Sequence, residues 1–366
     1  MTHTLPGTDI AIESLPKISL HDHLDGGLRP QTIIDIAAEE GIDLPETDAS
    51  ALGQWFADQS NSGSLVEYLK TFDVTTSVMQ TAPALQRIAR EFVEDLHTDG
   101  VICGEIRWAP EQHLAKGLSL DEAVEAVQAG IDEAVSAIDA AGGQIWIGQL
   151  ISAMRQADNG LDIAQLALRH RDRGAAGFDI AGPEAGFPPS RLHEAFDLLA
   201  SEFFPVTVHA GEADGVESIR SALLDGRALR LGHGVRIIED MQVQQDGDDI
   251  TVELGTVARW VLDRGIALET SPSSNIQTGA IGPDRAMADH PFNLLYRLGY
   301  SVTVNTDNRL MSNTTLSKEL ALLAETFDYD ADDLLAFQIN AAHAAFVSRA
   351  DKDQIIDTLI AGFEKI

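Results

Sequence analysis

The chain has 366 residues, 44% of them hydrophobic and 23% charged, proportions that are typical of a globular protein and that exclude a disordered or fibrous one. Acidic residues outnumber basic ones by 58 to 25, which gives a formal net charge of −33. Such a surface repels phosphate backbones, so we expect no nucleic-acid partner. Because no stretch approaches 18 consecutive apolar residues, we also expect no membrane span.

The length and the N-terminus indicate one domain in a reducing compartment. Single α/β barrels often exceed 250 residues, so we expect residues 1–366 to form one domain. The first residues show no basic region followed by an apolar stretch, as a secretory signal would. The one cysteine, Cys103, rules out an internal disulfide. We therefore expect a cytoplasmic protein, and nothing in the sequence indicates a protein partner.

Short apolar segments that end in polar or glycine-rich residues predict eight β-strands. Most intervals between them have helical periodicity, most clearly after Ser119 and Glu122, which form a capping box. Alternating strands and helices favour a parallel sheet, and eight strands close a (β/α)8 TIM barrel; an open doubly wound sheet is the alternative. The predicted strands span 18–24, 101–110, 145–153, 177–182, 205–212, 229–235, 266–275 and 301–308.

The first predicted strand contains His21 and His23. Side chains two residues apart in a strand point to the same side, here the barrel interior. This spacing suits two ligands of one metal ion. In a chain with 11 histidines it also arises by chance, so the pair alone is weak evidence for a metal site.

Residues 26–100, which follow this strand, form an oversized insertion with several helix-like stretches. In the segment 64–72, Leu65, Tyr68, Leu69 and Phe72 share one helix face. Barrel active sites are built from the loops after the C-terminal ends of strands, so we expect this insertion to be a lid over the site. The alternative is a helix that packs on the barrel without contacting a ligand. Extra helices are expected at the C-terminus.

Further strong metal ligands fall at the ends of later predicted strands, namely His209, His233 and Asp307. Core packing does not explain them, because buried imidazoles and carboxylates are costly without partners. Zn²⁺ accepts imidazole nitrogen and carboxylate oxygen, and a catalytic zinc site keeps a position for water that His233 and Asp307 could hold or deprotonate. The cysteine-rich pattern of one class of zinc enzymes, with its PCxxC motif, is absent. The sequence therefore predicts a metal-dependent hydrolase.

Glu212 lies three residues after His209, on the loop beyond the same strand. A carboxyl group there is close to the metal without being a ligand, which favours a role as general acid and base. The alternative is a glutamate at a helix N-terminus that the helix dipole stabilises.

Five motifs, in the order HDHLDG, HAGE, GHG, SPSSN and NTDN, resemble those of the adenosine deaminases of the amidohydrolase superfamily, above all the bacterial members. The resemblance runs from about residue 15 to the last helices. It implies a (β/α)8 barrel and one Zn²⁺ per chain. It assigns the ligands His21, His23, His209 and Asp307.

The resemblance also implies a reaction. A zinc-activated water would attack C6 of adenosine, and of 2′-deoxyadenosine, to give inosine and ammonia in purine salvage. Glu212 would protonate purine N1, while His233, together with Asp307, would orient the water and stabilise the developing charge. The implied substrate contacts are His23, Asp25 to the ribose and the backbone of Gly182 to purine N3. Without the resemblance, Gly182 would be a turn glycine and Asp25 a loop carboxylate.

The chain departs from the family pattern after Asp307. Where the family usually has a second aspartate and then proline, this chain has Asn308 and Arg309. An asparagine amide donates a hydrogen bond at any pH, so our hypothesis is that Asn308 contacts purine N7 with less pH dependence. Ser271 stands where the family often has cysteine, which we interpret as a packing difference.

Other functions stay open from the sequence. Deaminases of adenine or of a modified 6-aminopurine nucleoside would share the metal site, although Asp25 followed by two glycines favours a ribosyl substrate. A non-catalytic nucleoside-binding relative would have lost Glu212 or a ligand, and all are present. The remaining histidines are expected to be surface or structural residues: His3, His97, His113, His170, His193, His290 and His343.

Overall fold

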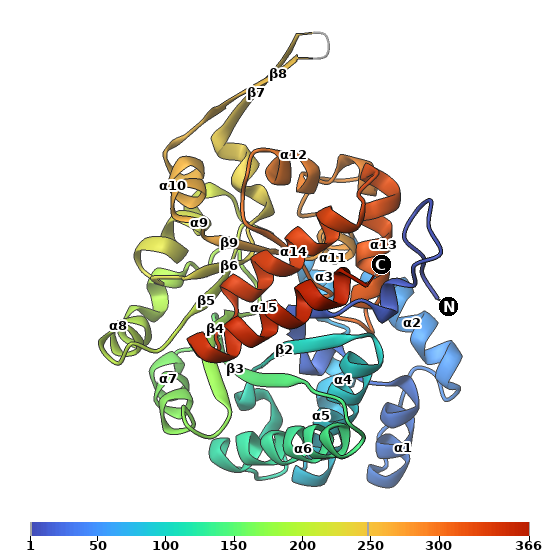
Figure 1. Ribbon diagram of the computed structural model, residues 1–366. Coiled ribbons are helices and arrows are strands. Elements are labelled where there is room, and N and C mark those ends of the chain that lie inside the picture. The colour runs from blue at the N-terminus through green and yellow to red at the C-terminus, as the bar shows by residue number, and fades with distance from the viewer. Residues whose placement is uncertain (1, 247–248, 366) are drawn as a thin grey trace.

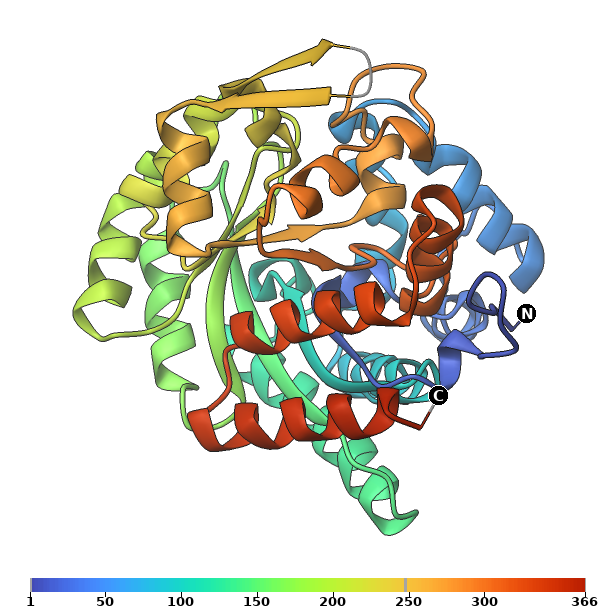
Figure 2. The ribbon, with the colours of Figure 1, turned by 45° about the horizontal axis from the view of Figure 1, so that its top comes forward.

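The computed structural model describes residues 2–246 and 249–365, and within them eight parallel strands form the wall of a barrel (Figures 1 and 2). Strands β1 to β4 pair in chain order, as do β5, β6, β9 and β10. Bridges at Phe178 and Val206 and at Asp22 and Asp307 join the two sets, so the sheet closes on itself. The strands are β1 (Lys17–His23), β2 (Val101–Trp108), β3 (Trp146–Met154), β4 (Ala175–Ala181), β5 (Thr207–Ala210), β6 (Arg230–His233), β9 (Ala267–Thr270) and β10 (Val302–Val304). The predicted barrel is confirmed, and the open sheet is excluded.

The barrel strands are buried on both faces, which explains why they read as nearly continuous apolar runs in the sequence. Helices cover the outer face, and the predicted capping box of Ser119 and Glu122 begins α6. No helix in the described part of the chain is both long and apolar enough to cross a membrane. The helices are α1 (Pro30–Glu40), α2 (Ala49–Ser60), α3 (Leu65–Leu69), α4 (Phe72–Val78), α5 (Ala82–Thr98), α6 (Leu120–Ala140), α7 (Gly160–Arg169), α8 (His193–Ser201), α9 (Val216–Leu224), α10 (Thr256–Arg264), α11 (Pro272–Gln277), α12 (Phe292–Arg297), α13 (Leu316–Phe327), α14 (Ala331–Ala344) and α15 (Arg349–Phe363).

The expected C-terminal helices are present as α14 and α15, which lie side by side (Figure 1). Ala341, Ala342 and Leu359 from these helices pack in one apolar cluster with Ile18 of β1 and Cys103 of β2. This packing covers the outer face of the strand that carries His21 and His23.

The insertion after β1 contains helices α1 to α5. The last of them, α5, packs along α6 and against β2, as a helix of the barrel's outer ring does. The segment that extends the fold beyond a simple barrel is therefore residues 30–78, shorter than the interval between the strands.

A hairpin of β7 (Met241–Asp246) and β8 (Asp249–Leu254) projects from the body between β6 and α10 (Figure 1). The sequence pattern did not predict this hairpin. Its strands alternate polar residues such as Gln242 and Gln244 with exposed Val243, so they lack the buried apolar run that identified the barrel strands.

The barrel interior holds a buried charge network of Glu105, Arg107, Asp179, Arg230 and Glu269, all at most 2% exposed. Arg107 lies 3.0 Å from Asp179 Oδ2 and 2.6 Å from Glu269 Oε2. Arg230 Nε lies 2.5 Å from Glu269 Oε1, and its guanidinium also contacts Glu105. Because each charge faces an opposite charge, mutual attraction offsets the large cost of burying them.

Candidate active site

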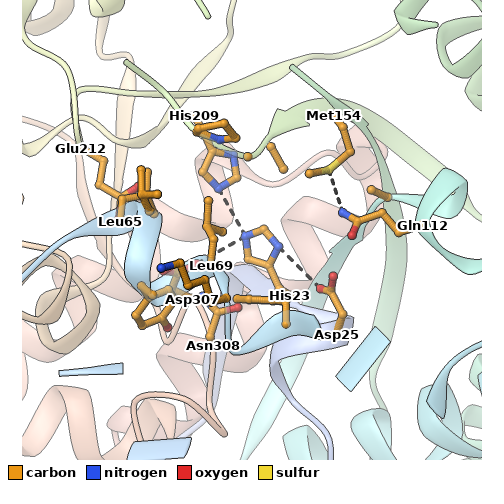
Figure 3. Close-up of a pocket in the computed structure, with 18 of the residues that line it drawn as sticks. His23, Asp25, Leu65, Leu69, Gln112, Met154, His209, Glu212, Asp307 and Asn308 are labelled. Atoms are coloured by element: carbon orange, nitrogen blue, oxygen red, sulfur yellow. Dashed lines mark hydrogen bonds and ion pairs between the residues drawn. The ribbon is translucent and has the colours of Figure 1, made fainter. Parts of the chain in front are cut away.

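A cavity of about 360 Å³ opens where the barrel strands end, and Figure 3 shows the side chains around it. This volume is in the range of small-molecule sites. His21 lies fully buried behind the cavity wall. The other site residues predicted from the sequence line the cavity: His23, Asp25, Gly182, His209, Glu212, His233, Asp307 and Asn308.

The four predicted metal ligands, His21, His23, His209 and Asp307, bring one ligand atom each to within 4.8 Å of one another. His23 Nε2 lies 3.3 Å from His209 Nε2, and Asp307 Oδ1 lies 3.3 Å from Nε2 of both His21 and His23. Ligand atoms of a tetrahedral site with bonds near 2.0 Å are about 3.3 Å apart. Within the described residues, His21 Nε2 is buried without a hydrogen-bond partner. Spacing and donor set therefore fit a metal ion such as zinc.

Two buried carboxylates hold the ligand histidines from behind. His21 Nδ1 lies 3.1 Å from Glu269 Oε2, and His209 Nδ1 lies 2.8 Å from Asp179 Oδ2. A carboxylate at Nδ1 fixes the proton there, so the lone pair of Nε2 faces the cluster. Burial also lowers the pKa of His23 and His209, which favours the neutral imidazole that binds metals.

Asp179 and Glu269 were not among the site residues predicted from the sequence. A signal existed, because each is the single carboxylate of its predicted strand and directly follows apolar residues. Charged side chains are rarely buried unless they are paired, so a charge in such a strand indicates a partner inside the barrel.

Asp307 and His233 both have left-handed backbone, with φ of 59° and 63°. For residues other than glycine this conformation costs about 1–3 kcal/mol, so the surroundings must impose it. The backbone of Asp307 accepts a hydrogen bond from the His23 amide and donates one to the His21 carbonyl, and its Oδ2 accepts a 2.6 Å hydrogen bond from Ser274. These contacts fix the carboxylate against β1.

His233 is held by Asn275, from the SPSSN segment. The Oδ1 of Asn275 accepts a hydrogen bond from the Ser271 amide, so its Nδ2 faces His233 Nδ1 at 2.9 Å and donates to it. Burial lowers the pKa of His233 well below the usual imidazole value. The neutral ring therefore carries its proton on Nε2, which points toward Glu212 Oε2 at 3.5 Å.

Glu212 lies on the loop between β5 and α9, before the helix begins, so the alternative of a glutamate at a helix N-terminus is wrong. The side chain is 5% exposed, and in the part of the chain that the structure describes its Oε1 has no hydrogen-bond partner. Burial, and then the charges of Asp307 and Glu184, raise the pKa of Glu212 well above the usual carboxyl value. A raised pKa favours the protonated carboxyl group, which is the form that can donate a proton.

Asp25, Gly182 and Asn308 also line the cavity, and none of them belongs to the metal-compatible cluster. Figure 3 shows Asp25 beside His23, with its Oδ1 4.0 Å from His23 Nδ1. Gly182 has φ of 101°, and a Cβ there would lie 2.6 Å from Gln156 Oε1, so only glycine fits. A Cβ at Gly26 would collide with the Asn308 side chain, which shows how closely the two loops approach.

The apolar face predicted for segment 64–72 points at the cavity. Leu65, Tyr68, Leu69 and Phe72 all line it, and Figure 3 shows Leu65 beside Glu212 and Leu69 near His23. The insertion therefore contacts the space that a ligand would occupy, as a lid requires.

Arg309 occupies the position where proline is usual in the resembling family. Its Nε lies 2.8 Å from Asp22 Oδ2, and its guanidinium lies 4.0 Å from the centre of the Phe92 ring. Proline could make neither contact. Ser271 is buried, and its hydroxyl finds no partner among the described residues, which agrees with a packing role.

The remaining histidines lie outside the metal cluster, as predicted, throughout residues 2–246 and 249–365. His113 and His290 are buried and hydrogen-bonded to the Met79 carbonyl and to Asn275, which are structural contacts.

Comparisons with known proteins agree with this site. The family model described as adenosine deaminase matches residues 16–362. Adenosine deaminase 1 of Streptomyces coelicolor is 52% identical over 350 residues, covering 95% of this chain and 87% of that protein. The adenosine deaminase of Mycobacterium ulcerans is 51% identical over 351 residues, covering 96% and 95%. Among solved structures, arabidopsis ADAL complexed with IMP has a TM-score of 0.79 at 25% identity, covering 97% of this chain and 98% of that one.

Proposed function

Because this chain belongs to the adenosine deaminase family, we propose that its cavity binds adenosine with C6 of the purine at the histidine–aspartate cluster. The family's reaction is hydrolytic deamination of adenosine to inosine and ammonia, and the chain is a hydrolase of this kind. The observation that carries our assignment of residues is that a metal-compatible cluster and the buried Glu212 carboxyl group meet in one cavity.

We propose zinc as the metal, held by His21, His23, His209 and Asp307. Three imidazole nitrogens and one carboxylate oxygen, with Nδ1 protons fixed by Glu269 and Asp179, form a donor set that zinc prefers. When bound, zinc supplies the Lewis acid that makes water a nucleophile at neutral pH.

Glu212 and His233 then act side by side at the reaction centre, Glu212 on purine N1 and His233 on the attacking water. The Glu212 carboxyl donates its proton to purine N1, where inosine keeps it, and this makes C6 more electrophilic. Of the two protons that the attacking water loses, one goes to the leaving amino group to form ammonia and the other restores the Glu212 carboxyl. His233 donates a hydrogen bond from Nε2 toward the attacking water, and Asp307 accepts its proton. The 3.5 Å between Glu212 Oε2 and His233 Nε2 supports this arrangement.

The remaining contacts concern the substrate's other parts. We propose that Asp25 binds the ribose and that the backbone of Gly182 contacts purine N3, with His23 at the edge between metal and substrate. The positive φ of Gly182 and the position of Asp25 on the cavity wall support these roles. The segment 64–72 would close over the bound nucleoside as a lid and exclude water.

The test is a spectroscopic assay of purified protein with adenosine, 2′-deoxyadenosine and adenine. We expect the ultraviolet change of 6-amino loss with both nucleosides, and much weaker activity on adenine, which lacks the ribose that Asp25 would bind. Activity confined to adenine or to N6-modified nucleosides would replace this proposal with those alternatives. No activity on any substrate would refute it.

Asn308 gives a prediction about purine recognition. If its amide donates to N7, 7-deazaadenosine loses that acceptor and leaves a buried donor unpaired, at a cost of about 1–3 kcal/mol. We expect kcat/KM for 7-deazaadenosine to be lower than for adenosine by roughly 5- to 150-fold. Asn308→Ala should erase the difference between the two substrates. Equal efficiency of the natural chain on both would contradict the contact.

We also propose a cytoplasmic role in purine salvage. The single cysteine, Cys103, is buried and unpaired, which suits a reducing compartment. The deaminated product keeps its ribose, so it can feed reactions that recover the purine base.

A further inference from the structure

The carboxylate of Glu184 is the centre of a dense set of hydrogen bonds. Glu184 follows β4, is 2% exposed and has no metal ligand as a neighbour in sequence. Its oxygens accept hydrogen bonds from the backbone amides of Gly211 (2.7 Å), Glu212 (3.0 Å), Ala213 (2.6 Å) and Asp214 (3.0 Å), and from the Ser218 hydroxyl (2.5 Å).

These four consecutive amides belong to the loop that carries Glu212, residues 211–214. Each of these residues has one backbone N–H, and all four point at the same carboxylate, which makes the loop an anion-binding nest. Gly211 enters the loop with φ of +78°, where a Cβ would lie 2.7 Å from Ile219. The conformation of the loop therefore depends on Glu184.

Glu184 is itself tied to the end of β5. The Phe187 amide donates to the Glu184 carbonyl, and the Phe187 carbonyl accepts a 2.8 Å hydrogen bond from Arg155 Nε. Arg155 Nη1 donates to the His209 carbonyl at 3.0 Å. The loop after β4 and the strand end that carries His209 are thus connected by a continuous series of hydrogen bonds.

We infer that Glu184 is a positioning residue that holds loop 211–214 so that the Glu212 carboxyl points into the cavity toward the purine ring. This inference rests on the proposed role of Glu212 as proton donor. The Glu212 amide is one of the four donors, so backbone and side chain of the same residue are fixed together. The negative charge of Glu184 also contributes, after burial and Asp307, to the raised pKa of Glu212.

The first test is Glu184→Gln. One carboxylate oxygen takes the Gly211 amide and Ser218, and the other takes three amides, so either orientation of a glutamine puts an NH2 group against N–H donors. We expect kcat for adenosine to fall about 10- to 100-fold, the usual loss when a residue that orients a functional group is changed, with KM altered far less. Bound metal per chain should stay the same.

The matched control is Asp240→Asn. Asp240 also accepts backbone amides, those of Val257 and Ala258 at the start of α10, but it does not line the cavity. Its replacement is expected to lower thermal stability and to leave kcat unchanged.

Two further variants apply if Glu184→Gln folds poorly. Ser218→Ala removes one of the five hydrogen bonds and should lower kcat by a smaller factor. Glu184→Asp keeps the charge and should retain part of the activity.

A double variant separates positioning from general structural support. If Glu184 acts through Glu212, then Glu184→Gln should not slow an enzyme that already carries Glu212→Gln. A double variant slower than Glu212→Gln by the full factor of Glu184→Gln would overturn the inference. An unchanged kcat in Glu184→Gln, with Glu212→Gln inactive, would overturn it as well and leave the proposed function intact. Normal kcat in Glu212→Gln would instead refute the proposed proton donor.

Discussion

Glu212→Gln is expected to lower kcat for adenosine by about 10²- to 10⁴-fold, because removal of a general acid and base typically costs that much. Glutamine has nearly the same shape, and it accepts and donates hydrogen bonds, but it cannot give up a proton. Because Glu212 is not among the four proposed ligands, metal bound per chain should match that of the unaltered protein. The measurements are steady-state kinetics on adenosine and elemental analysis of the metal.

Glu91→Gln is a suitable control for this substitution. Glu91 is also a buried glutamate, but it lies on α5 and contacts Thr32 and Arg87, away from the cavity. Its replacement should change stability and leave kcat almost unaltered. Turnover of Glu212→Gln close to that of the control would exclude Glu212 as the proton donor.

Removal of the metal is expected to abolish deamination and to destabilise the fold. Without the metal, the nucleophile is water with a pKa near 15.7 instead of about 7, so we expect activity to fall by more than about 10³-fold. A ligand that binds only the folded state stabilises it, by about 2.7 kcal/mol at 100 times its Kd, so the melting temperature should fall on chelation. The measurements are activity and thermal unfolding before and after dialysis against a chelator.

Add-back of ions tests the identity of the metal. One equivalent of Zn²⁺ per chain should restore activity, whereas Mg²⁺ should not, because a site with three imidazole ligands does not suit a hard cation. His21→Ala should resemble the metal-free protein, and His170→Ala, which removes a buried histidine on the outer side of the barrel, should not. Full activity in protein verified to be metal-free would contradict the proposed site.

The barrel and the metal cluster could be predicted from the sequence because the barrel topology alone brings most of the cluster residues together. In a closed parallel barrel all strands end at the same face, so residues far apart in the chain meet there if each stands at a strand end. His23, His209, His233 and Asp307 each satisfy this condition, and all line one cavity. Only the order of strands and helices was needed to bring them together.

The features that the sequence did not reveal depend on pairings between side chains of different elements. Periodicity identifies which face of a strand is buried, but it does not say that Arg107 on β2 meets Glu269 on β9. Glu184 lies in a loop, where a glutamate carries no sequence signal of a structural role. The five groups that donate hydrogen bonds to it are identified only when loop 211–214 is placed beside it. The β7–β8 hairpin was missed because an exposed ribbon has no buried face to set its pattern.

The buried charge network has a consequence for how the barrel assembles. Its members come from β2, β4, β6 and β9, and a slip of one residue in any of these strands would turn its charge to the outer face. The oppositely charged residue that lost its partner would stay buried and unpaired, which costs about 3–5 kcal/mol. This cost is a large part of the roughly 5–15 kcal/mol by which a typical domain is stable. Misaligned barrels are therefore selected against during folding. The pairing of opposite charges therefore favours one register of the strands. The same register determines how the histidines at the strand ends are arranged.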